Sequence, residues 1–217
     1  MNINWYGQSC FLITSSRGKG ESINIVIDPF DESIGLRVPK MEANVLLITH
    51  DHRDHNNIKA VSGNPFLIDG PGEYEVKEVF VQGIQSYHDE NSGKDRGINT
   101  IYTIETEDIK ICHLGDLGQK ELTSEQISQI GDVDILMIPV GGNFTISAKE
   151  AGKVMSQLEP SIVIPMHYSI PKLKIKLDPV DAFLKAVGVK KPETLSKLSI
   201  KKKDIVPEEA KIIVLNS

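Results

Sequence analysis

Cysteine and tryptophan are scarce in this sequence, which has two cysteines, Cys10 and Cys112, and one tryptophan in 217 residues. Two cysteines cannot build the disulfide framework that holds small secreted domains together, so we expect both thiols to be reduced. No apolar run approaches the roughly 20 residues that a membrane-spanning helix needs. Residues 1–5 also lack the basic and apolar regions of a signal peptide. These absences predict a cytoplasmic protein that does not enter the membrane.

A positive net charge is missing too. The net charge is −6 at pH 7, whereas a general nucleic-acid-binding protein is usually basic. One segment departs from this balance, because residues 171–203 contain ten lysines against Asp178, Asp181 and Glu193, a local charge of +7. This segment is either a solvated face or an electropositive rim that steers an anionic substrate toward a site.

The rest of the composition is that of a folded chain. Hydrophobic residues make up 40% of the sequence and charged residues 25%, which allows roughly 70% of the unfolded surface to be buried. The sequence contains no internal repeat, low-complexity tract or obvious linker. We therefore expect a single domain that spans residues 1–217.

Short apolar or β-branched runs, bounded by Gly, Pro, Asn or Asp, predict many β-strands. Capping-box spacings begin two predicted helices at Thr123 and Ser147. A third helix is predicted to begin with Asp178 as its N-cap and to end near Gly188. Two packed sheets with helices outside them would account for this order. The predicted strands are residues 3–6, 10–14, 23–27, 45–48, 65–68, 79–87, 99–105, 109–112, 133–138 and 161–165.

All six histidines lie at or just past the end of a strand-like run. Loops held at strand ends by a rigid sheet are where binding residues usually gather. Four separate segments of the chain share this arrangement, so it points to a common site. The histidines are His50, His52, His55, His88, His113 and His167.

The densest of these segments is H-x-H-x-D-H, from His50 to His55. In an extended chain His50 and His52 point to the same side, so both can bind one metal ion. Asp54 and His55 can face a second ion where the chain turns. A lone surface histidine is usually only solvated, but three histidines and an aspartate within six residues predict a metal site. Imidazole and carboxylate ligands suit Zn²⁺, Mn²⁺ or Fe²⁺.

The segment from His50 to His55 resembles the signature of the metallo-β-lactamase-fold hydrolase superfamily. The order that follows also matches: His88, then Asp116 in a Gly-Asp turn, then His167. The sequence is similar to the L-ascorbate-6-phosphate lactonase branch and its bacterial relatives. This resemblance implies an α/β fold, a four-layer αββα sandwich with a binuclear metal site along one edge. The local strings that support it are Trp5–Ser9, Ile27–Phe30, Gly70–Tyr74, His113–Asp116 and Pro165–Tyr168.

The resemblance also implies a role for each ligand. One ion would be bound by His50, His52 and His88, and the other by Asp54, His55 and His167, with Asp116 bridging both. Asp54 and His113 are the candidate catalytic residues. Asp54 would orient the attacking hydroxide. His113 would orient Asp116 or a bound anion, although it could instead replace His88 as a ligand.

Weaker candidates surround these residues. Gln8 stands where many lactonase relatives have a histidine, so substrate contacts from the first turn cannot be carried over. Asp28 would support a ligand, and Tyr168 would either donate to a leaving group or pack. Both cysteines are expected in the core. The loop candidates, each either lining the cleft or serving the loop alone, are Asp89, Arg96, Asn99 and residues 141–145.

The predicted function is metal-assisted hydrolysis. Two divalent ions, zinc before manganese or iron, would lower the pKa of a shared water from 15.7 toward ~7. The expected substrate is a small anionic ester, lactone or phosphoester. The alternatives are a phosphodiesterase or ribonuclease of the same fold, a metal-binding protein without turnover, and an antibiotic-degrading β-lactamase. Assembly into a homo-oligomer stays open.

Overall fold

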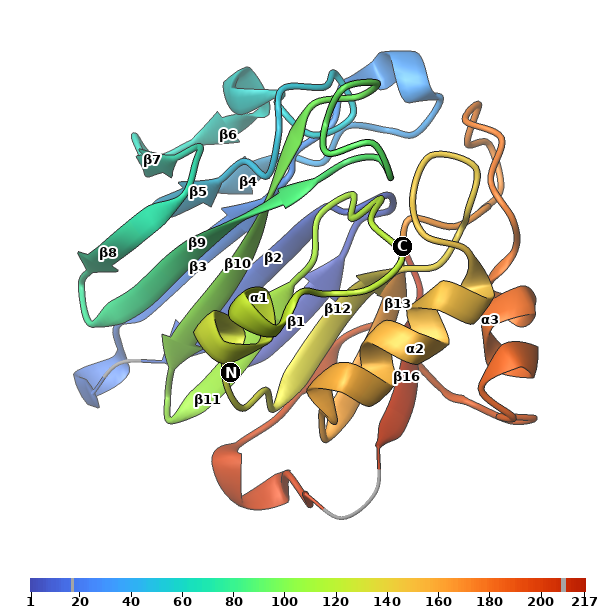
Figure 1. The fold of residues 1–217 in the computed structure, drawn as a ribbon. Coiled ribbons are helices and arrows are strands. Elements are labelled where there is room, and N and C mark those ends of the chain that lie inside the picture. Colours follow the sequence, from blue (N-terminus) through green and yellow to red (C-terminus); the bar gives the residue numbers. More distant parts are fainter. Residues whose placement is uncertain (17, 208–209) are drawn as a thin grey trace.

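The computed structural model describes residues 1–16, 18–207 and 210–217, and Figure 1 shows their fold. Residues 2–68 and the short strand β15 form a six-stranded sheet in the order β15-β1-β2-β3-β5-β7. Its first strands form antiparallel pairs, and β3, β5 and β7 are parallel. The strands are β1 (Asn2–Trp5), β2 (Phe11–Ser16), β3 (Ser22–Ile27), β5 (Val45–Leu47), β7 (Phe66–Ile68) and β15 (Leu198–Ser199).

The second sheet has eight strands in the order β14-β16-β13-β12-β11-β10-β9-β8. Its β8–β11 half is antiparallel, and its other half is parallel. A separate ribbon pairs β4 (Met41–Glu42) with β6 (Val61–Ser62). The strands of the second sheet are β8 (Gly72–Val76), β9 (Val79–Tyr87), β10 (Ile98–Thr106), β11 (Ile109–His113), β12 (Ile135–Pro139), β13 (Ile162–Met166), β14 (Glu193–Leu195) and β16 (Lys211–Leu215).

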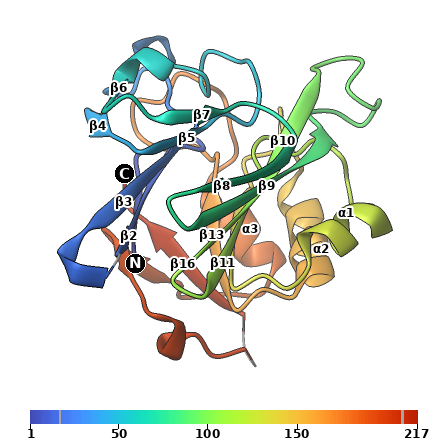
Figure 2. The same ribbon diagram turned by 90° about the vertical axis from the view of Figure 1, so that its left-hand side faces the viewer.

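The α-helices of the described residues cover the outer face of the second sheet (Figure 2). They are α1 (Ser124–Ile130), α2 (Ala148–Leu158) and α3 (Val180–Ala186). The capping boxes predicted at Thr123 and Ser147 are both formed. The predicted start of the third helix was wrong by one residue, because Pro179 rather than Asp178 takes the N-cap position. None of the helices in the described part of the chain is long and apolar enough to cross a membrane.

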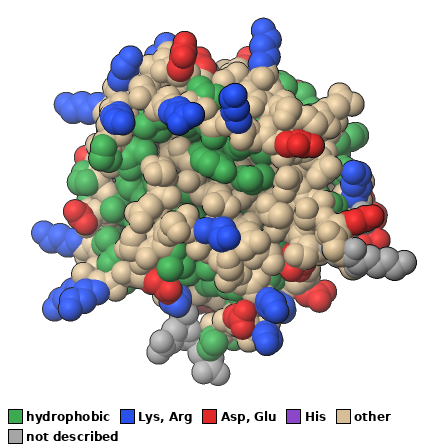
Figure 3. Space-filling model, turned by 180° about the vertical axis from the view of Figure 1, so that it is seen from behind, with side chains coloured by type: hydrophobic (Ala, Val, Ile, Leu, Met, Phe, Trp, Pro, Cys, Tyr) green, Lys and Arg blue, Asp and Glu red, His purple; other side chains and the backbone are tan. Residues whose placement is uncertain are grey.

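Apolar side chains fill both faces of the first sheet. Ile25 and Ile27 point into the core between the sheets, whereas Val26 belongs to a second cluster on the other face. That second cluster lies under the loop that carries Phe30 and Ile34. Figure 3 shows apolar side chains at the surface of the back face, with Lys and Arg among the charged residues around them. The short 3-10 helices are η1 (Gly18–Gly20), η2 (Glu32–Ile34), η3 (Ile58–Ala60) and η4 (Lys202–Asp204).

This architecture confirms the predicted mixed α/β fold with two packed sheets. On the side of the second sheet the outer layer is made of α-helices. On the side of the first sheet the covering segment contains η2 and extended chain. The arrangement matters for function because it lines up the ends of several strands at one edge of the sandwich.

Candidate metal centre

The carboxyl ends of strands from both sheets meet at one edge. Within the second sheet, β11 and β13 both run parallel to β12. Strand β9 has the same direction as β11, because each pairs antiparallel with β10. Side chains that follow these strands therefore come together. They are the segment from His50 to His55 after β5, His88 after β9, Asp116 after β11 and His167 after β13.

Seven side chains at this edge form two groups. Each group has its ligand atoms within 4.8 Å of one another. Together they comprise the seven predicted metal ligands, in the grouping that the resemblance implies. The first group is His50, His52 and His88, and the second is Asp54, His55, Asp116 and His167.

The two groups meet at Oδ2 of Asp116. This oxygen lies 4.0 Å from Nε2 of His50 and 3.3 Å from Nε2 of His88, which are both in the first group. It also lies 3.2 Å from Nε2 of His55 and of His167, in the second group. Two donors about 2.1 Å from one tetrahedral ion are about 3.4 Å apart. The separations therefore fit a metal ion on each side of this carboxylate.

A tight turn holds Asp116 in place. The backbone N–H of Asp116 donates to Oδ1 of Asn99 at 2.9 Å, and Nδ2 of Asn99 donates to the Leu114 carbonyl at 2.9 Å. Gly115 has φ +56°, and a Cβ at this position would collide with Asn99 and Thr49. Glycine is therefore needed on both conformational and steric grounds. Asn99, predicted as a candidate for the cleft, instead builds the turn that presents Asp116.

Asp28 orients two of the histidines from behind. Its Oδ2 accepts hydrogen bonds from the Thr49 hydroxyl at 2.7 Å and from Nδ1 of His55 at 2.9 Å. The Thr49 oxygen in turn is 2.9 Å from Nδ1 of His50 and accepts its proton. Both imidazoles therefore turn an unprotonated Nε2 toward the site when they are neutral. This is how carboxylates orient metal-binding histidines in general, and it is the supporting role predicted for Asp28.

Four ring nitrogens in the site are buried without a hydrogen-bond partner. They are Nε2 of His50 and of His55, and Nδ1 of His88 and of His167. Buried polar atoms in proteins are nearly always paired, so such a concentration needs a ligand to explain it. Imidazole and carboxylate donors suit a divalent transition metal. Metal ions would pair Nε2 of His50 and of His55, so the donor set fits them. Nδ1 of His88 and of His167 lies on the ring side opposite the Nε2 that faces Asp116.

The charges of the side chains follow from burial and from their neighbours. Burial lowers the pKa of His50 and of His88, and the charge of His55 lowers both further. Burial also acts to lower the pKa of His55, but Asp116 and Asp28 outweigh it and hold that pKa above its usual value. Burial works to raise the pKa of Asp116, yet the adjacent His167 and His55 keep it well below its usual range. In the protein without metal, these effects favour the neutral form of His50 and of His88 and the protonated form of His55.

His113 does not belong to either group. Its Nδ1 accepts from the Gly115 N–H at 3.1 Å, so its Nε2 carries the proton and donates to the Ser9 carbonyl at 3.0 Å. Ser9 Oγ donates to Oδ1 of Asp116 at 3.3 Å. His113 therefore reaches Asp116 only through the turns on either side of it. This placement disfavours the alternative in which His113 replaces His88, and it leaves the catalytic role of His113 a prediction.

Two predicted loop candidates differ in what they do. Asp89 accepts hydrogen bonds from four backbone N–H groups of its own loop, among them Gly93 and Arg96, so it shapes the loop. The guanidinium of Arg96 lies 4.6 Å from the ring centre of Phe144. This contact joins the loop after His88 to the 141–145 loop. Both loops were predicted as candidates for lining the cleft.

Tyr168 and the two cysteines are core residues. Tyr168 packs on Trp5 with ring centres 4.9 Å apart, and its hydroxyl is 3.5 Å from the Leu215 carbonyl. It therefore takes the packing role that the sequence left open. Cys10 and Cys112 are free and fully buried, as expected, and burial raises the pKa of the Cys112 thiol to about 12.

Sequence reasoning assigned no role to three residues that touch the ligands. Thr49 bonds His50, Ser9 bonds Asp116, and the side-chain amide of Gln8 donates to Oδ2 of Asp54 at 3.0 Å. Two of these residues lie in the turn between β1 and β2. No local pattern distinguishes such a turn from an ordinary one, because its contacts are made with residues about 50 or 100 positions away.

Comparisons with known proteins agree with this geometry. A family model described as the beta-lactamase superfamily domain matches residues 2–167. The UPF0173 metal-dependent hydrolase of Thermococcus onnurineus is 30% identical over 220 residues, covering 88% of this chain and 93% of the relative. That of Pyrobaculum islandicum is 30% identical over 217 residues, covering 83% and 89%.

A solved structure of the same superfamily is also similar to this chain. It is a Thermotoga maritima protein assigned to the zinc-dependent hydrolases of the metallo-beta-lactamase superfamily. It is 38% identical to this chain, with a TM-score of 0.79, and the match covers 99% of this chain and 97% of that one.

The fold and the clustered histidines and aspartates thus define a metal-dependent hydrolase. The chain belongs to the beta-lactamase superfamily, as its family model and relatives show. The predicted superfamily and the predicted enzyme class are therefore confirmed. The geometry of the site bears on three further points, namely the substrate, the number of ions and their identity.

Proposed function

We propose that this protein is a binuclear hydrolase that acts on a small anionic ester, lactone or phosphoester, with zinc as its metal. The observation that carries the proposal is the position of Oδ2 of Asp116, which lies 3.2–4.0 Å from histidine nitrogens of both ligand groups. A carboxylate between two divalent cations offsets their mutual repulsion. Zinc is supported by the donor set and by the assignment of the Thermotoga maritima protein.

Each ion would have its own ligands in this chain. His50, His52 and His88 would hold one, Asp54, His55 and His167 the other, and Asp116 both. When bound, two such ions supply a hydroxide nucleophile at neutral pH and stabilise charge on the reacting oxygens. The residues around the two ligand groups would orient the attacking water and attract the substrate.

Asp54 is the candidate for orienting the attacking water. Its Oδ2 lies 3.5 Å from Nε2 of His55, and its side chain is 18% exposed, the most open carboxylate of the cluster. Burial acts to raise the pKa of Asp54, but the adjacent imidazole of His55 and its charge hold that pKa below its usual range. An ionised carboxylate open to solvent can accept a hydrogen bond from water and fix its direction.

The lysines near the metal edge support an anionic substrate. Lys172, Lys174 and Lys176 are exposed in the segment that directly follows His167. The backbone N–H of Lys174 donates to the Ile34 carbonyl at 2.8 Å, so this segment is anchored. Positive charge beside a site raises the local concentration of anions.

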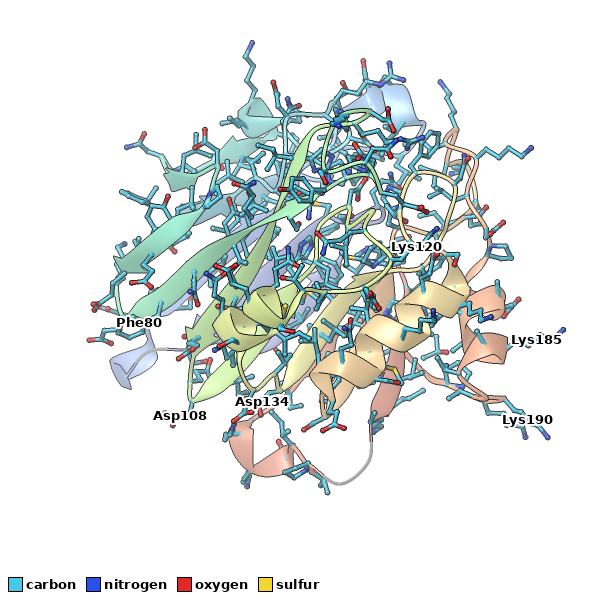
Figure 4. All side chains as sticks on the ribbon, viewed as in Figure 1. Phe80, Asp108, Lys120, Asp134, Lys185 and Lys190 are labelled. Atoms are coloured by element: carbon cyan, nitrogen blue, oxygen red, sulfur yellow. The ribbon has the colours of Figure 1, made fainter. Side chains whose placement is uncertain are left out.

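The remaining lysines of the 171–203 segment do not form one patch with these three. Lys202 makes an ion pair with Asp134 at 2.7 Å, and Figure 4 places Asp134 at the end of the sandwich away from the labelled Lys120. Lys185 and Lys190 extend outward beside α3 (Figure 4). The segment is therefore a solvated face over most of its length, and only its first lysines can serve as an electropositive rim.

The other end of the sandwich has the opposite charge. A groove of about 1020 Å³ there is lined by seven carboxylates and by two lysines, Lys110 and Lys202, which pair with Glu105 and Asp134. The excess of carboxylates repels anions, whereas the lysines after His167 attract them. The uneven charge of the surface therefore directs an anionic substrate toward the metal edge.

A substrate panel tests this proposal. Zinc-loaded protein should hydrolyse members of a set of anionic lactones, esters and phosphoesters and leave RNA and β-lactams intact. The triple variant Lys172→Glu, Lys174→Glu, Lys176→Glu should raise KM for any active substrate by about 10-fold or more at low salt, with kcat nearly unchanged. Its matched control is Lys185→Glu, Lys190→Glu, Lys191→Glu, which should leave KM as in the wild type.

Three results would contradict the proposal. RNA cleavage would establish the nuclease alternative, and stoichiometric zinc without turnover of any compound would establish a metal-binding protein. Equal KM values for the two triple variants would show that the lysines after His167 do not attract the substrate. We place the protein in the cytoplasm, which its two free cysteines support.

A further inference from the structure

The turn between β1 and β2 contacts the metal centre through a buried glutamine. Gln8 is fully buried and has φ 50°, a left-handed conformation that is uncommon for a side chain of this size. Its carbonyl accepts two hydrogen bonds, from Nε1 of Trp5 at 2.9 Å and from the N–H of His167 at 3.0 Å. The backbone of Gln8 is therefore fixed between the first strand and a ligand-bearing residue.

The side chain of Gln8 makes one contact and leaves one atom unpaired. Nε2 donates to Oδ2 of Asp54 at 3.0 Å, whereas Oε1 is buried without a hydrogen-bond partner. The opposite orientation of the amide would set Oε1 against the carboxylate oxygen, so the contact with Asp54 decides which atom stays unpaired. Oε1 is bonded to the same carbon as Nε2, and it therefore lies beside the second ligand group.

An unpaired buried acceptor destabilises the folded chain. A methionine at this position would fill a similar volume without a polar atom. The amide must therefore contribute something other than packing. Unsatisfied polar groups in functional sites are commonly paired only when a ligand is bound.

We propose that Gln8 is a positioning residue of the metal centre, whose N–H holds Asp54 in its ligating orientation and whose Oε1 accepts a hydrogen bond from water bound beside Asp54. The second half of this statement rests on the proposed function. The first half does not, because it concerns only the carboxylate orientation and hence metal affinity. Substituting a residue that orients a metal ligand typically weakens binding 10–100-fold.

The test compares Gln8→Met with Gln82→Met. Gln82 undergoes the same chemical change on β9, five residues before the end of that strand and away from the ligands. In metal-free protein we expect both variants to melt close to the wild-type temperature. In Gln8→Met the loss of the bond to Asp54 is offset by the loss of the unpaired Oε1. In titrations with Co²⁺ we expect Gln8→Met alone to weaken one of two binding steps by 10–100-fold. The absorption spectrum of that step should also change.

Gln8→His supplies a rescue, because an imidazole provides both an N–H donor and an acceptor. We expect it to restore Co²⁺ affinity to within a few-fold of the wild type. A lower melting temperature of metal-free Gln8→Met with unchanged Co²⁺ binding would overturn the proposal and make Gln8 a packing residue. Binding of only one Co²⁺ by the wild type would contradict the proposed function, but the effect of Gln8→Met on that ion would still decide the role of Gln8.

Discussion

The two ligand groups at the metal edge differ in charge and in exposure. The first consists of three imidazoles, and one of them, His52, is exposed to solvent. The second contains two carboxylates and two histidines, and only Asp54 in it is partly exposed. An ion in the second group meets the buried charge of both Asp54 and Asp116, whereas an ion in the first group meets three imidazoles and shares only the charge of Asp116. We therefore expect the second group to bind its ion more tightly.

Asp116 connects the two groups, so its substitution should have the largest effect. Asp116→Asn keeps the size and one acceptor oxygen but removes the charge that offsets two cations. We expect a folded protein that loses at least one ion and falls by two orders of magnitude or more in hydrolysis. Metal content and turnover measure this, with circular dichroism as the control for folding. Wild-type metal content and rate would reduce Asp116 to a turn residue.

Removing a ligand from the first group should distinguish the two groups by their metal content. We expect His88→Ala to lose the ion of that group and to keep the other. His113→Ala should keep both ions and lose about 10–100-fold in affinity or activity, because His113 acts through the Ser9 and Gly115 turns. The two variants are compared by metal content at equal protein concentration. An empty site in His113→Ala with a full site in His88→Ala would reverse the assignment.

The pH dependence of metal binding should differ between the groups by about one proton. The pKa of His50 and of His88 is lowered, chiefly by burial, so both are neutral and release no proton to an ion. The pKa of His55 is raised by Asp116 and Asp28 against the effect of burial, so below that pKa it must lose its proton before it binds. We expect the affinity of the second group to rise about 10-fold per pH unit in that range.

A chelator competition between about pH 6 and 8 measures both binding constants. The first group should show a nearly flat profile. Equal slopes for the two binding steps would contradict the proposed difference in protonation. His55 also affects the stability of the metal-free protein. Because the pKa of His55 is raised by folding, its contribution to stability is fully present below the unfolded pKa of about 6.5 and is lost as the pH rises through the folded value.

Sequence patterns predicted the local parts of this structure well. The capping boxes at Thr123 and Ser147 are formed because they need only residues three apart. Strand β9 occupies residues 79–87 as predicted, since its length and β-branched content leave little choice. The prediction omitted β8 at the sheet edge, with its exposed glutamates, and β16, an ordinary apolar strand. It also omitted the short strands β4, β6, β14 and β15.

The candidate site likewise has a part that the sequence predicts and a part that it does not. The seven candidate ligands follow from the resemblance to the superfamily signature, and the structure brings them together because they follow strands whose carboxyl ends meet at one edge. The partners that orient them could not be found. Gln8, Ser9 and Thr49 are small or ordinary polar residues. Strand pairing within the first sheet brings the β1–β2 turn to Asp54, and the packing of the second sheet brings it to Asp116.

The number of ions bound per chain tests the central claim, that Asp116 joins two metal sites, most directly. Metal-free protein titrated with Co²⁺ should bind two equivalents in two steps of unequal affinity, and the tighter step should be the one that Asp54→Asn weakens. Saturation at one equivalent would contradict the claim. So would two equivalents of equal affinity that respond alike to Asp54→Asn.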